Sequence, residues 1–348
     1  MKENPHKPKQ IISLGAGSDT RYFRLRHKYP DIKLIYHEFD FPENTRKKLS
    51  ILRRHPSPLD LVGSFESITQ EHHGHPSTQS LIFNADSLYS PAGGLNIHPL
   101  DLRSLLYQDP PPPEFKYLDP MIPTLILSEM CLCYQTTNES NAIMKLLLSR
   151  YLSPSTPAAF ILYEPIRPHD SFGRVMTANF SKRNISMPTL NSFPTLVSQR
   201  QRLKDAGFTA GQGAADIDFI FRNWVKGTER VRLNQECEQL DEEEEWVLLA
   251  RHYCVSWGWR DGELRGEEET EMEIDRTIDE EERERRKTAE LDRKMAANVF
   301  SRCWNGVVGD ERDDSKDMMP RDVNRFGPGS GLGGGGSGER LRDPLAED

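Results

Sequence analysis

The sequence lacks the features of several large classes of protein. Its apolar runs fall well short of the roughly 20 residues that cross a bilayer, so we expect no membrane partner. Its net charge is −9 at pH 7, which argues against nucleic acid as the main partner. Among its five cysteines, the pair Cys131 and Cys133 has no second pair at the spacing of a structural zinc site. We therefore expect no metal.

A secretory leader is also missing at Met1-Lys2-Glu3, which favours reduced thiols and a cytoplasmic location. Hydrophobic residues make up only 36% of the 348-residue chain and charged residues 28%. A chain of this composition does not bury all of its length in compact structure. The sequence therefore predicts one domain with appendages rather than two domains.

What the chain does contain is a buried-strand pattern that ends in a glycine turn. The apolar residues of 11–14 suit a strand buried on both faces. Gly15 and Gly17 let the backbone turn where a side chain would collide with a bound ribose or adenine, although a tight turn without a ligand is the alternative interpretation. The third glycine of a dinucleotide site is replaced by Thr20, which favours a cofactor without a pyrophosphate, such as S-adenosylmethionine.

Acidic residues follow three predicted strands. In the strand at 34–40, Glu38 and Asp40 point to the same face, and Asp40 is the better candidate for binding ribose because it is nearer the carboxyl end. The strand at 123–129 ends in Glu129, which either borders the ligand or caps the following helix.

For the third strand, Asp86 and Asp101 are competing candidates, and the residues alone do not separate them. Both are acids in the region where the strand should reach the ligand edge of the sheet. The adenine-side acid is therefore one of these two residues.

Strand and helix patterns alternate from about residue 8 to residue 262, which predicts an α/β fold with a mainly parallel sheet. Residues 54–98 are rich in Pro, Ser, Gly and His and are predicted to be a surface insertion. Residues 263–326 are highly charged and are expected to be either helical or disordered, and residues 327–348 form a Gly-rich tail that we expect to be disordered.

Five short motifs occur in a specific order: Leu14-Gly15-Ala16-Gly17-Ser18-Asp19-Thr20-Arg21, Glu38-Phe39-Asp40-Phe41-Pro42, Leu100-Asp101-Leu102-Arg103, Ser128-Glu129 and Arg251-His252-Tyr253. With them, the chain resembles the leucine carboxyl methyltransferases over about residues 8–262. The resemblance implies a class I S-adenosylmethionine-dependent methyltransferase (Rossmann-like) sheet with flanking helices, and S-adenosyl-L-methionine as cofactor. It also implies methyl esterification of the C-terminal leucine α-carboxylate of the catalytic subunit of the type 2A protein phosphatase.

The resemblance further implies which residues form the site. Those that would contact the cofactor are Gly15, Gly17, Asp40, Asp101, Leu102 and Glu129. Among them, Asp40 would hold the ribose, Asp101 with Leu102 would lie at the adenine, and Glu129 would border the methionine portion. Tyr134 matches a tyrosine that the family places at the substrate, where it would position the carboxylate.

The chain departs from the family pattern at its start, because the family has a helical segment before the glycine strand and this sequence begins only ten residues before it. Residues 1–262 are thus expected to be a methyltransferase domain without that segment. Two alternatives stay open: a class I methyltransferase acting on another carboxylate, and an inactive pseudoenzyme that binds the phosphatase. We expect a monomer.

Overall fold

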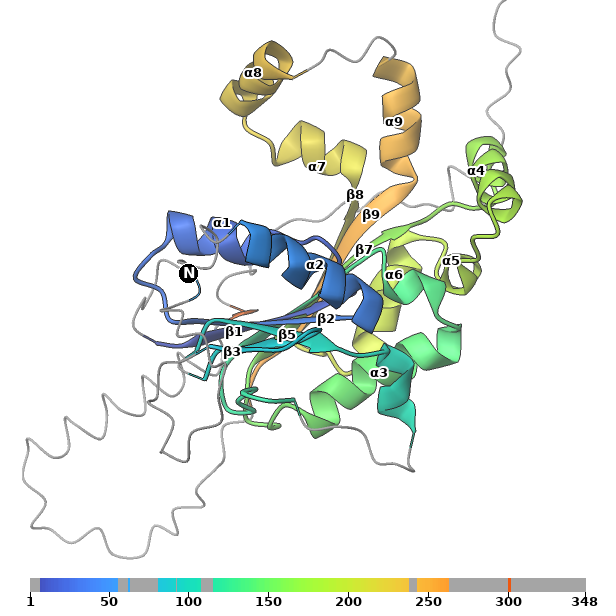
Figure 1. Cartoon of the computed structure of the whole chain (residues 1–348). Helices are drawn as coiled ribbons and strands as arrows, with labels where there is room; N and C mark the ends of the chain where they lie inside the picture. Colours follow the sequence, from blue (N-terminus) through green and yellow to red (C-terminus); the bar gives the residue numbers. More distant parts are fainter. Residues whose placement is uncertain are drawn as a thin grey trace, which may run out of the picture. The chain divides into compact units, whose positions relative to one another are not determined.

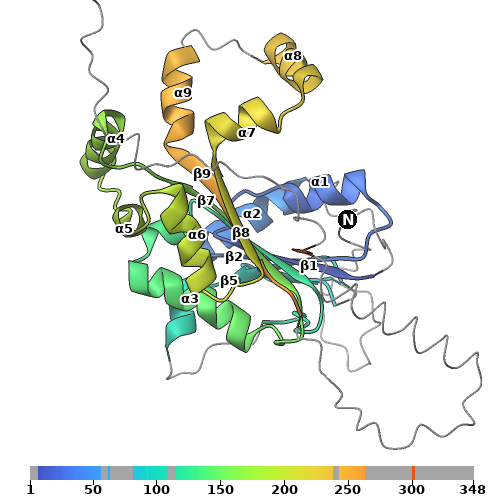
Figure 2. The ribbon, with the colours of Figure 1, turned by 180° about the vertical axis from the view of Figure 1, so that it is seen from behind.

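The computed structural model describes residues 7–55, 62, 81–91, 93–107, 115–237, 243–262 and 300–301. They all belong to one compact unit, Met1–Arg312, and the second unit of the chain, Asp313–Asp348, lies outside them. The described residues form a nine-stranded sheet (Figures 1 and 2). Its strands are β1 (Lys9–Leu14), β2 (Leu34–Asp40), β3 (Ile82–Phe83), β4 (Leu88–Tyr89), β5 (Leu95–Pro99), β6 (Thr124–Glu129), β7 (Ala158–Pro165), β8 (Gly211–Asp216) and β9 (Tyr253–Arg260).

The strand order is β3-β4-β5-β2-β1-β6-β7-β9-β8. Strands β5, β2, β1, β6 and β7 are parallel, and β9 runs antiparallel between β7 and β8. The chain order reverses at β1, where β2 lies on one side and β6 on the other. This topology is that of the class I methyltransferases and confirms the predicted fold class. In such a sheet, ligands bind outside the carboxyl ends of the strands at the reversal, here those of β1, β2 and β6.

Nine α-helices and two 3₁₀ helices connect the described strands. The α-helices are α1 (Arg21–Lys28), α2 (Pro42–Arg54), α3 (Thr137–Arg150), α4 (Ser171–Lys182), α5 (Pro188–Ser192), α6 (Leu196–Asp205), α7 (Ile217–Asn223), α8 (Gly227–Glu236) and α9 (Glu243–Arg251). The 3₁₀ helices are η2 (Leu102–Leu106) and η3 (Leu132–Tyr134). None of the described helices has the length and apolar character needed to cross a membrane.

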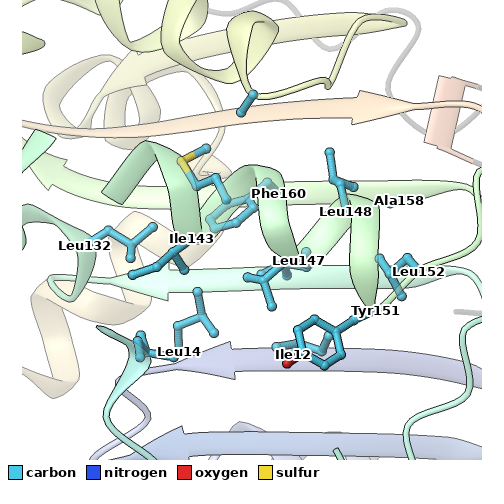
Figure 3. Packing of buried hydrophobic residues seen from close by; sticks show 14 of the residues in the cluster. Ile12, Leu14, Leu132, Ile143, Leu147, Leu148, Tyr151, Leu152, Ala158 and Phe160 are labelled. Atoms are coloured by element: carbon cyan, nitrogen blue, oxygen red, sulfur yellow. The ribbon is translucent and has the colours of Figure 1, made fainter. Parts of the chain in front are cut away.

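The two faces of the sheet carry separate layers of helices. Figure 1 shows α1 and α2 along one face and α3 and α6 along the other. On the α3 side, Ile12 and Phe160 from the strands meet Ile143 and Leu147 from α3 in the largest apolar cluster (Figure 3). All four side chains are fully buried. Helix α3 begins at a capping box between Thr136 and Glu139, which fixes where the chain leaves the sheet edge.

Part of the predicted insertion at 54–98 belongs to the sheet. Leu88 and Leu95 are fully buried, and β5 pairs in parallel with β2 from Tyr36 to Asp40. The prediction of a surface insertion is therefore wrong for these strands. The proline, serine and histidine content of the region concealed three short strands, β3, β4 and β5. Residues 56–61 and 63–80 lie outside the described residues.

The structure describes two residues beyond the domain boundary predicted at residue 262, and both belong to the same unit as the sheet. Phe300 packs against the apolar cluster of Trp257 and Trp259, and Ser301 bonds to Trp259. The other residues of 263–326, and the tail 327–348, lie outside the described residues.

Candidate active site

The turn after β1 is built by glycines in the left-handed backbone region. Gly15 has φ +62° and Gly17 has φ +50°, which side-chain-bearing residues adopt at a cost. At Gly15 there is also no room for a side chain, because a Cβ would lie 2.6 Å from Sγ of Cys131. The turn therefore presents bare backbone at the carboxyl end of β1.

Asp40 ends β2 and is bonded to this turn. Its Oδ2 accepts a hydrogen bond of 2.6 Å from the backbone N–H of Gly17. Its Oδ1 accepts from the backbone N–H of Phe41 and from Nδ2 of Asn44, both at 2.7 Å. A carboxylate has about four acceptor positions, so Asp40 keeps capacity for a further donor such as a hydroxyl.

Glu38, the other acid of β2, has a different partner. Its Oε2 lies 2.5 Å from Nζ of Lys48, and both side chains are buried. Burial raises the pKa of Glu38 to about 7, while the nearby ammonium of Lys48 lowers it. Lys48 also donates to the backbone oxygen of Asp19 at 2.6 Å. Glu38 thus holds α2 and the glycine turn in place, and Asp40 remains as the acid of β2 that faces the ligand edge.

The structure separates Asp101 from Asp86. Asp101 follows β5, the third parallel strand, and the neighbouring Leu100 N–H donates to the backbone oxygen of Asp40 at 2.7 Å. Asp86 lies in the turn between β3 and β4, which is an antiparallel hairpin one strand further out. Asp101 is therefore the acid adjacent to Asp40.

Asp101 and Leu102 have well-defined surroundings. Oδ1 of Asp101 caps η2 by accepting from the backbone N–H of Arg103 at 3.0 Å, and Oδ2 pairs with the Arg103 guanidinium at 2.6 Å. The side-chain hydrogen bond from Arg103 holds the pKa of Asp101 below its usual value. Leu102 is buried in the main apolar cluster. Its position on η2 fixes the backbone of this segment beside β2.

Glu129 at the end of β6 faces the glycine turn across a cavity. The cavity holds about 360 Å³, and its lining includes Gly15, Asp19, Arg21, Glu129 and Met130. Glu129 forms an ion pair with Arg21, and Arg21 also pairs with Asp19 at 3.0 Å. The cavity thus contains both signs of charge beside exposed backbone.

The backbone bends sharply directly after Glu129. Met130 has φ +47°, a conformation that costs a non-glycine residue about 1–2 kcal/mol. The bend brings Cys131 against Gly15. Burial raises the pKa of Cys131 to about 12, so its thiol stays protonated and is not a nucleophile.

Tyr134 lies at the end of η3, five residues after Glu129, and its side chain is 45% exposed. It is outside the cavity that Gly15 and Glu129 line. Partial burial raises the pKa of its hydroxyl, which is therefore a hydrogen-bond donor at neutral pH. The structure places Tyr134 on the same edge of the sheet as Glu129, on a segment accessible to a ligand.

Sequence reasoning missed four residues that shape this edge: Asp19, Arg21, Met130 and Cys131. Asp19 and Arg21 stand inside the first motif, and their spacing to the glycines was a signal that could have been used. The bend at Met130 and the packing of Cys131 on Gly15 depend on contacts between distant segments.

The geometry fits a nucleoside cofactor with a charged tail. A Cβ at Gly17 would lie 3.9 Å from its nearest neighbour, Oδ2 of Asp40, so the turn is open at this position, and Asp40 has acceptor capacity left for ribose hydroxyls. The cavity beyond Gly15 offers Arg21 to a carboxylate and Glu129 to an ammonium group. The donor and acceptor set is therefore matched to an amino-acid-bearing nucleoside.

The strand order and this turn define a methyltransferase of class I by fold. The family model described as leucine carboxyl methyltransferase matches residues 4–147. Leucine carboxyl methyltransferase 1 of Aspergillus fumigatus is 41% identical over 291 residues, which cover 78% of this chain and 70% of that protein. The chain belongs to the leucine carboxyl methyltransferase family.

Two further relatives and one solved structure are also similar to the chain. Leucine carboxyl methyltransferase 1 of Emericella nidulans is 42% identical over 271 residues, 74% of this chain and 67% of that protein. Human tRNA wybutosine-synthesizing protein 4 is 33% identical over 246 residues, 71% of this chain and 33% of that protein. The structure of Haemonchus contortus phosphoethanolamine N-methyltransferase 2 with S-adenosyl-L-methionine has a TM-score of 0.40 and 11% identity, covering 73% of this chain and 48% of that one.

Proposed function

We propose that this protein transfers the methyl group of S-adenosyl-L-methionine to the α-carboxylate of the C-terminal leucine of the type 2A protein phosphatase catalytic subunit. Membership in the leucine carboxyl methyltransferase family supports the reaction class. The two alternatives, another carboxylate substrate and an inactive phosphatase-binding protein, are not favoured by relatives of this name and similarity. The cytoplasmic location and the monomeric state stay predictions.

The main structural support for the proposal is the hydrogen bond between the backbone N–H of Gly17 and Asp40. This contact lies beside a cavity that Gly15 and Glu129 line. In the proposal, Gly15 and Gly17 lie against the adenosyl group and Asp40 accepts from the ribose hydroxyls. Asp101 and Leu102 border the adenine, and Glu129 borders the methionine portion. When bound, the cofactor supplies an electrophilic methyl group on a sulfonium.

Methyl transfer to a carboxylate requires little acid–base chemistry from the protein. A terminal carboxyl group has a pKa near 3.5 and is ionised at neutral pH, so no general base is required. Glu129 then has no proton to remove. The protein's contribution would be to position the carboxylate against the bound cofactor and to exclude water. Tyr134 serves this positioning by donating a hydrogen bond from its hydroxyl group to the carboxylate.

The direct test is incubation with S-adenosyl-L-methionine and a peptide of the phosphatase C-terminus, followed by mass spectrometry. We expect one added methyl group on the terminal carboxyl. The matched control is the same peptide with a C-terminal amide, which should gain none. Because the peptide omits the rest of the subunit, the intact phosphatase is assayed in parallel.

Two results would contradict the proposal. Methylation of the amide peptide would place the methyl group elsewhere than the terminal carboxylate. Binding of cofactor and phosphatase, each measured by calorimetry, without any methylation of either substrate would instead indicate the pseudoenzyme.

A further inference from the structure

The two faces of the central strands β6 and β7 are not equally covered. On the α3 side, Ile126 and Phe160 are fully buried. On the opposite side, Leu125, Leu127 and Ile161 are only partly buried. Strands in the middle of a parallel sheet normally bury both faces against other elements. We therefore expect a further segment to cover the partly buried apolar side chains on the second face of β6 and β7.

A mainly apolar cavity of about 560 Å³ lies over this face. Its lining includes Leu127 of β6, Ile161 and Tyr163 of β7, and Val255 of β9. Burying apolar surface stabilises a protein, so filling this cavity with apolar side chains is favourable. We call the surface formed by Leu125, Leu127, Ile161, Tyr163 and Val255 the open face.

One described segment of the chain already rests at the margin of the open face. The indole N–H of Trp259 donates to Oγ of Ser301 at 2.7 Å, and the same hydroxyl donates to Oδ2 of Asp261 at 2.6 Å. Phe300 packs against the cluster that contains Trp257 and Trp259. Leu125, Ile161 and Val255 of the open face also pack against this cluster. Phe300 and Ser301 have helical backbone geometry.

The sequence around Phe300 is amphipathic. Apart from Ala297, its apolar residues are Met295, Ala296, Val299, Phe300, Cys303 and Trp304. They are spaced at i, i+1, i+4, i+5, i+8 and i+9, which puts them along one side of a helix, with Asn298 and Arg302 on the other side. An apolar stripe of this kind suits an apolar face such as the open face.

We propose that residues 295–304 of this chain are the occupant of the open face. The segment is anchored by Ser301 at the end of β9 and lays its apolar stripe on Val255, Ile161 and Leu127. A second copy of the chain or a foreign peptide could present an apolar stripe as well, but Phe300 and Ser301 are the residues seen in contact beside this face. The inference concerns packing and not the methyl transfer itself, although the cavity over the open face borders the candidate active site at Arg21 and Glu129.

The test uses Cys303 on the stripe as a probe. The chain is treated with a maleimide, and labelling of each cysteine is followed by mass spectrometry relative to its rate in denaturant. Exposed Cys237 reports free access, and fully buried Cys254 reports that the core is intact. We expect Cys303 to label at least about tenfold more slowly than Cys237, as protection by local packing requires.

Two neighbouring substitutions separate docking from a general effect of charge. Val299→Asp puts a carboxylate on the stripe, and we expect it to bring the labelling of Cys303 close to that of Cys237 while Cys254 stays protected. Asn298→Asp adds the same charge on the polar side and should leave Cys303 protected.

Three outcomes would overturn the proposal. The first is equal labelling of Cys303 and Cys237 in the unchanged chain. The second is an equal effect of Val299→Asp and Asn298→Asp. The third is protection of Cys303 that disappears on dilution together with a dimer in light scattering, which would identify a second copy as the occupant.

Discussion

The backbone N–H of Gly17 donates a hydrogen bond of 2.6 Å to Oδ2 of Asp40, 23 residues further along the chain. This bond joins the turn after β1 to the end of β2. A single contact therefore fixes the position of Asp40, proposed to bind the ribose, relative to the turn that is proposed to bind the adenosyl group. The same carboxylate accepts from Phe41 and Asn44, which fixes its orientation. An acid held in this way needs little reorganisation when a ligand binds.

Replacing Asp40 by Asn should weaken cofactor binding. The amide keeps one acceptor but loses the charge, and its NH₂ group faces the N–H of either Gly17 or Phe41. A hydrogen bond to a charged group contributes about 1.5–3 kcal/mol, so we expect at least a tenfold loss of affinity for S-adenosyl-L-methionine by calorimetry. Asp86→Asn, in the β3–β4 turn, is the control and should bind normally. Equal affinities of the two variants would contradict the role of Asp40.

Gly15→Ala should damage both stability and binding. A Cβ there meets Cys131 at 2.6 Å, in addition to the left-handed backbone. Gly93→Ala is the matched control, because Gly93 has φ +86° but its Cβ would lie 3.6 Å from the nearest atom, in Ile35. We expect Gly93→Ala to lower the free energy of unfolding by about 1 kcal/mol in urea titration and Gly15→Ala to lower it by more. Only Gly15→Ala should abolish cofactor binding. Normal binding by this variant would argue against the glycine turn as the cofactor site.

Glu129→Gln should affect binding without affecting stability. Its ion pair with Arg21 joins side chains that are 53% and 36% exposed, and such pairs contribute about 0–1 kcal/mol. The control is Glu229→Gln, which removes a comparably exposed ion pair with Arg232 on α8. Both variants should melt within a few degrees of the unchanged chain. Cofactor affinity should fall only for Glu129→Gln, and a large drop in its melting temperature would indicate a structural role instead.

The sequence was most informative where strands are buried on both faces. The apolar runs of 11–14, 34–40 and 123–129 predicted β1, β2 and β6, because a central parallel strand must be apolar on each side. Acids at the ends of these runs then predicted Asp40 and Glu129 at the ligand edge. These predictions needed only local pattern and the rule that carboxyl ends meet at one edge.

Strand β8 was not predicted, because its sequence Gly-Gln-Gly-Ala-Ala-Asp has little strand preference. The structure shows why it is glycine-rich. A Cβ at Gly211 would lie 2.2 Å from the ring of Trp259, and one at Gly213 would lie 2.3 Å from that of Trp257. The glycines make room for large side chains on the neighbouring strand, a relationship between segments about 45 residues apart that local reasoning does not detect.

Helix α9 shows the same limit. The acidic start of residues 241–253 and the helical spacing of Trp246, Leu248, Leu249 and Tyr253 predict a helix docked on the core. The helix forms as α9, but Leu248 and Leu249, which were expected to dock on the core, are 45% and 46% exposed. Instead Trp246 packs edge-on against Phe221 of α7. Periodicity predicted the helix correctly, whereas the face that it buries depends on where its neighbour lies.

Tyr134→Phe separates substrate positioning from cofactor binding. Loss of one neutral hydrogen bond costs about 0.5–1.5 kcal/mol, so we expect kcat to fall by about three- to tenfold in the peptide assay. Cofactor affinity should not change, since Tyr134 lies outside the cavity that Glu129 lines. Tyr117→Phe, which is similarly exposed and packs near Tyr89, should behave as the unchanged enzyme. Full activity of Tyr134→Phe would remove this residue from the site.

The stability of the protein should fall in mild acid because of two buried histidines. Nδ1 of His37, in the middle of β2, lies 3.0 Å from Nε2 of His98 on the neighbouring strand β5. Burial lowers the pKa of His37 to about 3. Burial, His37 and Lys116 together hold the pKa of His98 well below its usual value. Both imidazoles are therefore neutral in the folded protein at pH values where they are charged in the unfolded chain.

The sign follows from proton binding. Between pH 6.5 and about 3 the unfolded chain binds more protons at His37 than the folded one, so stability rises with pH and is lost as the pH falls below 6.5. Each such histidine contributes a slope of up to about 1.4 kcal/mol per pH unit. In urea titrations between pH 6 and pH 4, His37→Asn should reduce the slope of unfolding free energy against pH by about this amount. His27→Asn, on the surface of α1, should leave the slope unchanged. If the slope for His37→Asn equals that of the unchanged chain, the loss of stability in acid does not come from His37.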